Sequence, residues 1–122
     1  MVLSDLIGNS LETKPLVAPD SADSGNDVIR LTRSGADGTL GDEGYSVTVT
    51  SDEVVVRASR AAGLFYGVQT LRHMLPPLVE YEGAFPAPLW LPGADITDSP
   101  RFVWRGTMLD VARHFLEVDE VK

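Results

Sequence analysis

The fold is decided by residues 45–75, YSVTVTSDEVVVRASRAAGLFYGVQTLRHML. Apolar and polar residues alternate over Tyr45–Val49, and a second run rich in β-branched residues follows over Val54–Ala58. The polar pair Ser51–Asp52 between the two runs is typical of a turn. This pattern predicts a β-hairpin with one buried face.

A helix is predicted directly after the hairpin. Ser59 could cap it through its hydroxyl, and Pro76 ends it. Gly63 and Gly67 lie four residues apart on one flank, where missing side chains would let the sheet approach the helix backbone closely. From Ala61 onward, one apolar stripe is expected to face the sheet: Leu64, Phe65, Val68, Leu71 and Leu75.

Upstream of the hairpin, the spacing of apolar residues predicts a helix of two or three turns over Leu3–Leu16. Val28–Arg33 predicts a half-buried strand with Ile29 and Leu31 on its apolar face. The glycine-rich stretch Gly35–Gly44 is interpreted as tight turns, because no Gly-Lys-Ser/Thr follows to complete a phosphate loop.

Downstream of the helix, Leu89–Leu91 predicts a short edge strand and Ala94–Asp98 a further strand. A domain boundary is predicted near Ser99–Pro100. Taken together, these elements predict an α+β fold: an antiparallel sheet with one or two helices packed on it.

The composition limits the classes of function. The chain has 122 residues, 10 Lys and Arg against 18 Asp and Glu, a formal charge of -8, and no cysteine. The negative charge disfavours nucleic acid and anionic membranes as partners, and the lack of cysteine excludes disulfides and thiolate metal sites within the chain. Residues 1–7 lack the features of a signal peptide, and no apolar run reaches membrane-spanning length, so a soluble protein is expected, either cytoplasmic or secreted.

Residues 98–115, DSPRFVWRGTMLDVARHF, hold most of the groups capable of chemistry. A short apolar run, Thr107–Leu109, predicts one buried strand that ends in Asp110. Arg113 and His114 follow within four residues. Charged groups at the end of a strand are typical of the active-site face of an α/β barrel.

This segment resembles the opening of the catalytic barrel in family 20 β-N-acetylhexosaminidases, whose pattern is close to DxPRFxWRGxxLDxxRHF. Ala61–Leu71 resembles the signature helix of the smaller domain that precedes that barrel. The resemblance implies a non-catalytic α+β domain over residues 1–99, followed over residues 100–122 by the first strand and the start of the first helix of a (β/α)8 barrel. Because such a barrel needs about 250 residues, the chain is expected to be truncated.

The resemblance also implies a function for the complete enzyme. It would remove terminal N-acetylglucosamine or N-acetylgalactosamine from glycans by a substrate-assisted retaining mechanism. Arg105 matches the family's sugar-binding arginine, whose guanidinium can hold two adjacent hydroxyls. Asp110, Arg113 and His114 would line or support the same pocket. On the residues alone, Arg105 could instead pair with a carboxylate and hold the strand end.

No catalytic residue is expected within this chain. The family uses an adjacent Asp-Glu pair on a later barrel strand, whereas Asp119–Glu120 lies in the first turn of the predicted last helix, where acidic residues favour the helix dipole. The two histidines, His73 and His114, lack the spacing of a metal site, and His73 is interpreted as a surface residue. No cofactor is implied.

Two other interpretations remain open. The chain could be a free-standing packing or interaction module derived from a carbohydrate-active enzyme, or part of a different two-domain enzyme that shares the small domain. If the chain is part of a hexosaminidase or of a different two-domain enzyme, the segment from about Phe102 onward needs the remainder of that enzyme's catalytic domain to cover its apolar residues. In this chain, that segment is expected to be mobile or to be covered by another chain.

Overall fold

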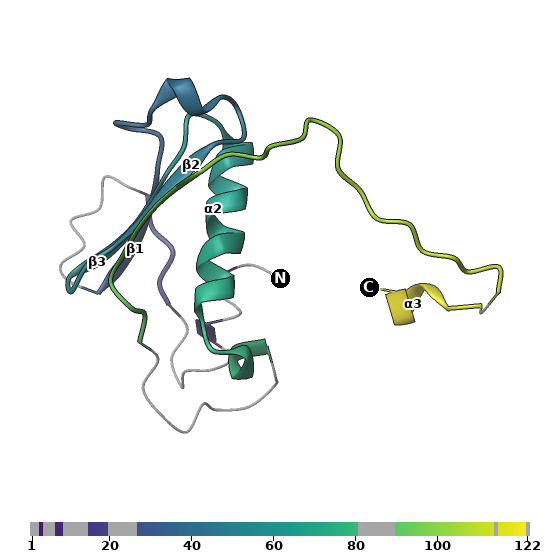
Figure 1. Ribbon diagram of the computed structural model, residues 1–122. Helices are drawn as coiled ribbons and strands as arrows, with labels where there is room; N and C mark the ends of the chain where they lie inside the picture. The colour runs from purple at the N-terminus through teal and green to yellow at the C-terminus, as the bar shows by residue number, and fades with distance from the viewer. Residues whose placement is uncertain are drawn as a thin grey trace.

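The computed structural model describes residues 3, 7–8, 15–19, 27–80, 90–113 and 115–121. One long helix, α2, lies across a twisted sheet, and the chain after the last strand runs away from this body (Figure 1). In chain order the elements are β1 (Val28–Thr32), η1 (Gly38–Leu40), β2 (Tyr45–Val49), β3 (Glu53–Arg57), α2 (Ala61–Met74), η2 (Pro77–Glu80), β4 (Ala94–Asp98) and α3 (Val118–Val121). The α+β class, the hairpin β2–β3, and strands β1 and β4 are therefore confirmed.

The sheet is mixed, although an antiparallel sheet was predicted. Its strand order is β1-β3-β2-β4, in which β2 pairs antiparallel with β3 and β4, whereas β1 pairs parallel with β3. Residues 33–44 carry the chain past the position of β3 to β2, and the hairpin then brings β3 back between β1 and β2, where it runs parallel to β1. Alternation in the sequence predicts strands, but it does not specify which strands become neighbours.

The core lies between α2 and one face of the sheet. Val47, Val56 and Leu71 are completely buried there. Phe65, which was predicted to face the sheet, is instead 59% exposed, so this part of the predicted stripe is wrong. The buried side of α2 is centred on Gly63, Gly67 and Leu71, because the two glycines let the helix backbone turn toward the sheet.

The glycines make the close approach that the sequence predicts. A Cβ atom on Gly63 would lie 2.3 Å from the carbonyl oxygen of Gly44, and one on Gly67 would lie 2.4 Å from Cγ1 of Val56. Either contact is far inside the ordinary van der Waals distance. Both glycines therefore set the distance between α2 and the sheet.

Two further predictions are corrected. Ser59 does not cap α2, since the helix begins after Arg60 and has no side-chain cap. Ile29 and Leu31 are 39% and 43% exposed. Their register opposite Val54 and Val56 places them on the helix-bearing face, but α2 packs over β2 and β3 and does not cover the edge strand β1.

The predicted helix over Leu3–Leu16 lies largely outside the described residues; Leu3, Ile7 and Gly8, which are described, are helical. Leu89 also lies outside them, and Trp90 and Leu91 form no strand. The predicted strand over Thr107–Leu109 is not formed. Within the described part of the chain, no strand lies beside this segment to receive its backbone hydrogen bonds.

The segment after β4 exposes most of its apolar side chains. Trp104 is 91% exposed and Met108 94%. That this segment is mobile or covered by another chain stays a prediction. The other large apolar residues exposed here are Phe102, Val103, Leu109, Val111, Phe115, Val118 and Val121.

Candidate functional site

Arg105 lies in the exposed segment after β4, and its side chain contacts the α+β body. One terminal nitrogen, Nη2, donates hydrogen bonds to Oε1 of Glu43 at 2.9 Å and to the hydroxyl of Tyr66 at 2.7 Å. The guanidinium carbon also lies 5.2 Å from the centre of the Tyr66 ring. The other terminal nitrogen, Nη1, donates to the carbonyl oxygen of Phe102. Four interactions thus hold one guanidinium.

Backbone packing places Glu43 beside Tyr66. Gly63 in the first turn of α2 receives the Gly44 carbonyl in the space where a side chain would lie. Glu43 precedes Gly44, and Tyr66 lies one helical turn beyond Gly63, so this close contact brings the backbones of the two residues near each other. The Tyr66 hydroxyl also lies 3.4 Å from Oε1 of Glu43, to which it can donate.

Arg105 and Glu43 each stabilise the charged form of the other. The hydrogen bond from Arg105 holds the pKa of Glu43 below its ordinary value, although limited desolvation opposes this shift. Hydrogen bonds to Glu43 and Tyr66 raise the pKa of Arg105. The Glu43 and Arg105 side chains are 39% and 33% exposed, so solvent screens the pair partly. Of the five N–H donors of a guanidinium, the bonds above use three, which leaves Nε–H and one Nη1–H for another acceptor.

Of the other predicted pocket residues, Asp110 and Arg113 contact each other and not Arg105. Asp110 Oδ1 accepts hydrogen bonds from the backbone amides of Ala112 at 2.9 Å and Arg113 at 3.3 Å, and Oδ2 forms an ion pair with Arg113 Nη1 at 3.3 Å. This is a local turn on an exposed segment. His114 lies outside the described residues.

Sequence reasoning missed Glu43 and Tyr66 as partners of Arg105. Tyr66 lies inside the quoted helix motif, but it was not singled out there. Glu43 lies in the glycine-rich stretch interpreted only as turns. The signal that could have found Glu43 is its position directly before Gly44 and the buried strand β2, because a carboxylate there needs a nearby cation or solvent.

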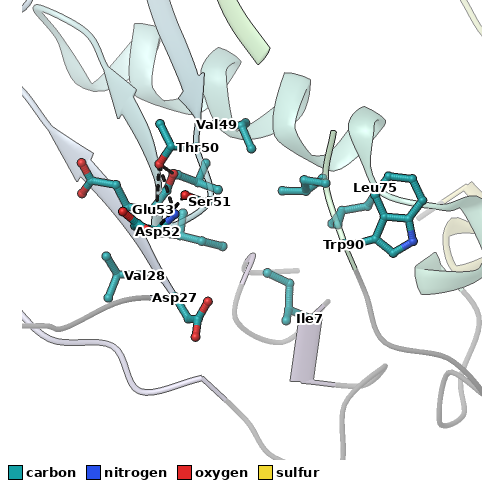
Figure 2. A pocket seen from close by; sticks show the side chains of 13 residues that line it. Ile7, Asp27, Val28, Val49, Thr50, Ser51, Asp52, Glu53, Leu75 and Trp90 are labelled. Carbon is teal, nitrogen blue, oxygen red and sulfur yellow. Dashed lines mark hydrogen bonds between the residues drawn. The ribbon is translucent and has the colours of Figure 1, made fainter. Parts of the chain in front are cut away.

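A separate hollow of about 520 Å³ lies at the opposite end of β2 (Figure 2). Its apolar part includes Val49, Val54 and Leu75, and the exposed Trp90 lies at its rim. The polar side chains around it are Asp27, Thr50, Ser51, Asp52 and Glu53. Glu43 precedes β2, whereas Thr50 follows it. The hollow is therefore distinct from the cluster formed by Arg105, Glu43 and Tyr66.

The described residues lack the features of a metal site and of a membrane-spanning helix. No group of three or more His, Cys, Asp or Glu side chains converges there as metal ligands. His73 is exposed, as predicted. No helix in the same ranges is long and apolar enough to cross a bilayer.

The chain belongs to glycosyl hydrolase family 20: residues 3–99 match the model of "Glycosyl hydrolase family 20, domain 2". The family resemblance of the sequence is therefore confirmed. The matching residues span the sheet and α2 and include both Glu43, in the turn before β2, and Tyr66 on α2.

Known proteins similar to this chain are hexosaminidases. A β-N-acetylhexosaminidase of Cellulomonas fimi is 35% identical over 122 residues, which is all of this chain and 23% of that protein. A β-hexosaminidase of Porphyromonas gingivalis is 43% identical over 83 residues, covering 68% of this chain and 11% of the relative. The chain thus spans less than a quarter of the length of these relatives.

The fold is similar to a solved structure of a mutant Streptomyces plicatus β-hexosaminidase in complex with its product, GlcNAc. The two superpose with a TM-score of 0.78 at 42% sequence identity, over 98% of this chain and 23% of the other. The similarity therefore includes the segment after β4 as well as the α+β body.

Proposed function

We propose that this chain is the non-catalytic α+β domain of a β-N-acetylhexosaminidase, joined to the beginning of its catalytic barrel. Residues 1–99 would form the domain, and residues 100–122 the first barrel strand and the start of the first barrel helix. The observation that carries the proposal is the similarity to the Cellulomonas fimi enzyme, which extends over the whole chain. A shared small domain alone would match only the part before Ser99.

The complete enzyme would hydrolyse glycosides that end in N-acetylglucosamine or N-acetylgalactosamine. In the substrate-assisted retaining mechanism, a glutamic acid protonates the glycosidic oxygen while the substrate's own acetamido oxygen attacks the anomeric carbon. An adjacent aspartate orients that acetamido group. This chain would supply neither carboxylate and would be inactive alone, because Asp119 and Glu120 lie in the exposed first turn of α3.

Arg105 would bind hydroxyls of the terminal sugar. A guanidinium presents planar donors in a fixed fork, which suits two adjacent hydroxyl oxygens. Two of its N–H groups are left over from the contacts with Glu43, Tyr66 and Phe102. Asp110, Arg113 and His114 would line or support the pocket once the barrel orders their segment.

The exposed apolar segment supports an enzyme over a free-standing interaction module. Val103 is fully exposed, and Trp104 and Met108 are more than 90% exposed. Such a patch on an independent domain would promote aggregation, whereas the remainder of a barrel would bury it. The partner of this segment is therefore proposed to be the rest of the catalytic barrel.

The test is a comparison of arginine variants in a protein that continues the chain through its downstream reading frame. With a chromogenic N-acetyl-β-glucosaminide, Arg105→Ala should lower kcat/KM by about ten- to a hundredfold, the size expected for lost hydrogen bonds from a charged group. The control is Arg33→Ala, which removes an exposed arginine after β1 and should leave kcat/KM unchanged. Equal values for the two variants would contradict the sugar-binding role.

A further inference from the structure

We infer that Glu43 and Tyr66 of the α+β domain are positioning residues for Arg105: they hold its guanidinium in place before the sugar binds. The inference rests on the proposed function, because it assigns the small domain a role in the sugar site that Arg105 would form. It concerns two side chains that lie 62 and 39 residues before Arg105 in the chain. The domain would then contribute to substrate affinity without touching the substrate.

The first step is the geometry of the cluster. Arg105 follows β4 by several residues, and its long side chain has many rotamers. Glu43, Tyr66 and the Phe102 carbonyl contact the two terminal nitrogens, and the guanidinium carbon lies over the Tyr66 ring, 5.2 Å from its centre. A side chain that is already ordered loses less conformational entropy when a ligand binds.

The second step is the rigidity of the support. The backbones that carry Glu43 and Tyr66 approach each other closely, because the Gly44 carbonyl occupies the space where a side chain on Gly63 would lie. One residue further along, the buried Tyr45 hydroxyl bonds to Thr70 on α2 and donates to Asp98 Oδ2 at the end of β4 at 3.2 Å. The start of β2, the middle of α2 and the beginning of the Arg105 segment are therefore tied together.

The third step is how the five N–H donors of Arg105 are shared between the protein and the sugar. Glu43 and Tyr66 both contact Nη2, while Nη1 keeps one N–H and Nε keeps its own. The support therefore holds one corner of the fork and leaves donors on the other nitrogens for sugar hydroxyls. A carboxylate that bound both edges of the fork would have blocked the substrate.

The experiment is a double-mutant cycle in the protein that continues the chain into the complete barrel. Glu43→Gln should raise KM for the chromogenic glucosaminide about three- to fivefold, the effect of losing a partly exposed ion pair, with kcat unchanged. In an Arg105→Ala background the same substitution should have no further effect, because its influence acts through Arg105. Tyr66→Phe should raise KM in the same way.

The matched control is Glu53→Gln. Glu53 is also 39% exposed and also pairs with an arginine, Arg30 at 3.5 Å, but on the sheet away from this cluster. It should leave KM unchanged. If Arg105→Ala lowers kcat/KM and Glu43→Gln leaves KM unchanged, the positioning role is wrong and the proposed function stands. If Arg105→Ala has no effect, the sugar-binding role fails and the positioning role with it.

A second measurement covers the case in which a variant of the larger protein does not fold. In the 122-residue chain, NMR titration of the Glu43 carboxyl should give a pKa below the ordinary value of 4.5. Arg105→Gln should return that pKa to its ordinary value. An unchanged titration curve after Arg105→Gln would show that the pair does not form and would overturn the inference.

Discussion

Replacing Gly63 with alanine tests the contact on which the domain's geometry depends. The added Cβ would lie 2.3 Å from the Gly44 carbonyl oxygen and 2.7 Å from Cβ of Ala58, where ordinary contacts begin at 3.4 Å. The Gly44 contact is with backbone, so no side chain can rotate away, and α2 must withdraw by about 1 Å. Overpacking of this kind costs about 1–3 kcal/mol, and the better helix propensity of alanine returns at most about 1 kcal/mol.

Gly63→Ala should therefore lower the free energy of unfolding by about 1–2 kcal/mol, which corresponds to a fall in Tm of about 4–15 °C for a domain of this size. Thermal unfolding followed by far-UV circular dichroism measures the change. Gly38→Ala is the matched control, because Gly38 has negative φ and open space around it, and its Tm should stay the same or rise slightly. Equal stability of Gly63→Ala and the wild type would refute the close-approach argument.

Three further outcomes are expected. Leu71→Ala should lower the free energy of unfolding by about 2–5 kcal/mol in urea denaturation, because Leu71 is completely buried and the cavity would stay empty. Ser59→Ala should change Tm very little, since no side chain caps α2; a large fall would show that Ser59 makes the cap after all. The Glu43–Arg105 contact should be complete above pH 4.5 and lost as the pH falls through the lowered pKa of Glu43, which the NMR resonances of the Arg105 Nη2 protons would report.

Local patterns in the sequence predicted the hairpin, β1, β4 and the long helix, but neither which strands are neighbours nor that Thr107–Leu109 forms no strand. The alternation over Tyr45–Val49 and the run after it give the observed hairpin, and the long helix ends within a residue of its prediction. The parallel position of β1 depends on how residues 33–44 cross the sheet, and no local periodicity records that path.

The face of a helix is also decided by its surroundings. Counting apolar residues placed Phe65 toward the sheet, whereas the observed helix turns its glycine side inward. Gly63 and Gly67 are the sites of close approach, so they, and not the most apolar residues, mark the side that faces the sheet. A helix packs on its closest-fitting side, which need not be its most apolar side.

The candidate site shows the same limit. Arg105 stood out because it lies in a family motif, but its partners come from a turn and a helix that are distant in sequence. An ion pair across 62 residues follows from the packing of Gly44 against Gly63, which only the folded chain displays.

The most direct test of the account is a hydrolysis assay with a chromogenic N-acetyl-β-glucosaminide on two proteins: this 122-residue chain and the chain continued through its downstream reading frame. The account predicts turnover by the continued protein and none by the 122-residue chain, because the acid and the acetamido-orienting carboxylate would lie on a later barrel strand. Turnover by the 122-residue chain, or a continued protein that neither hydrolyses nor binds the glucosaminide, would contradict it.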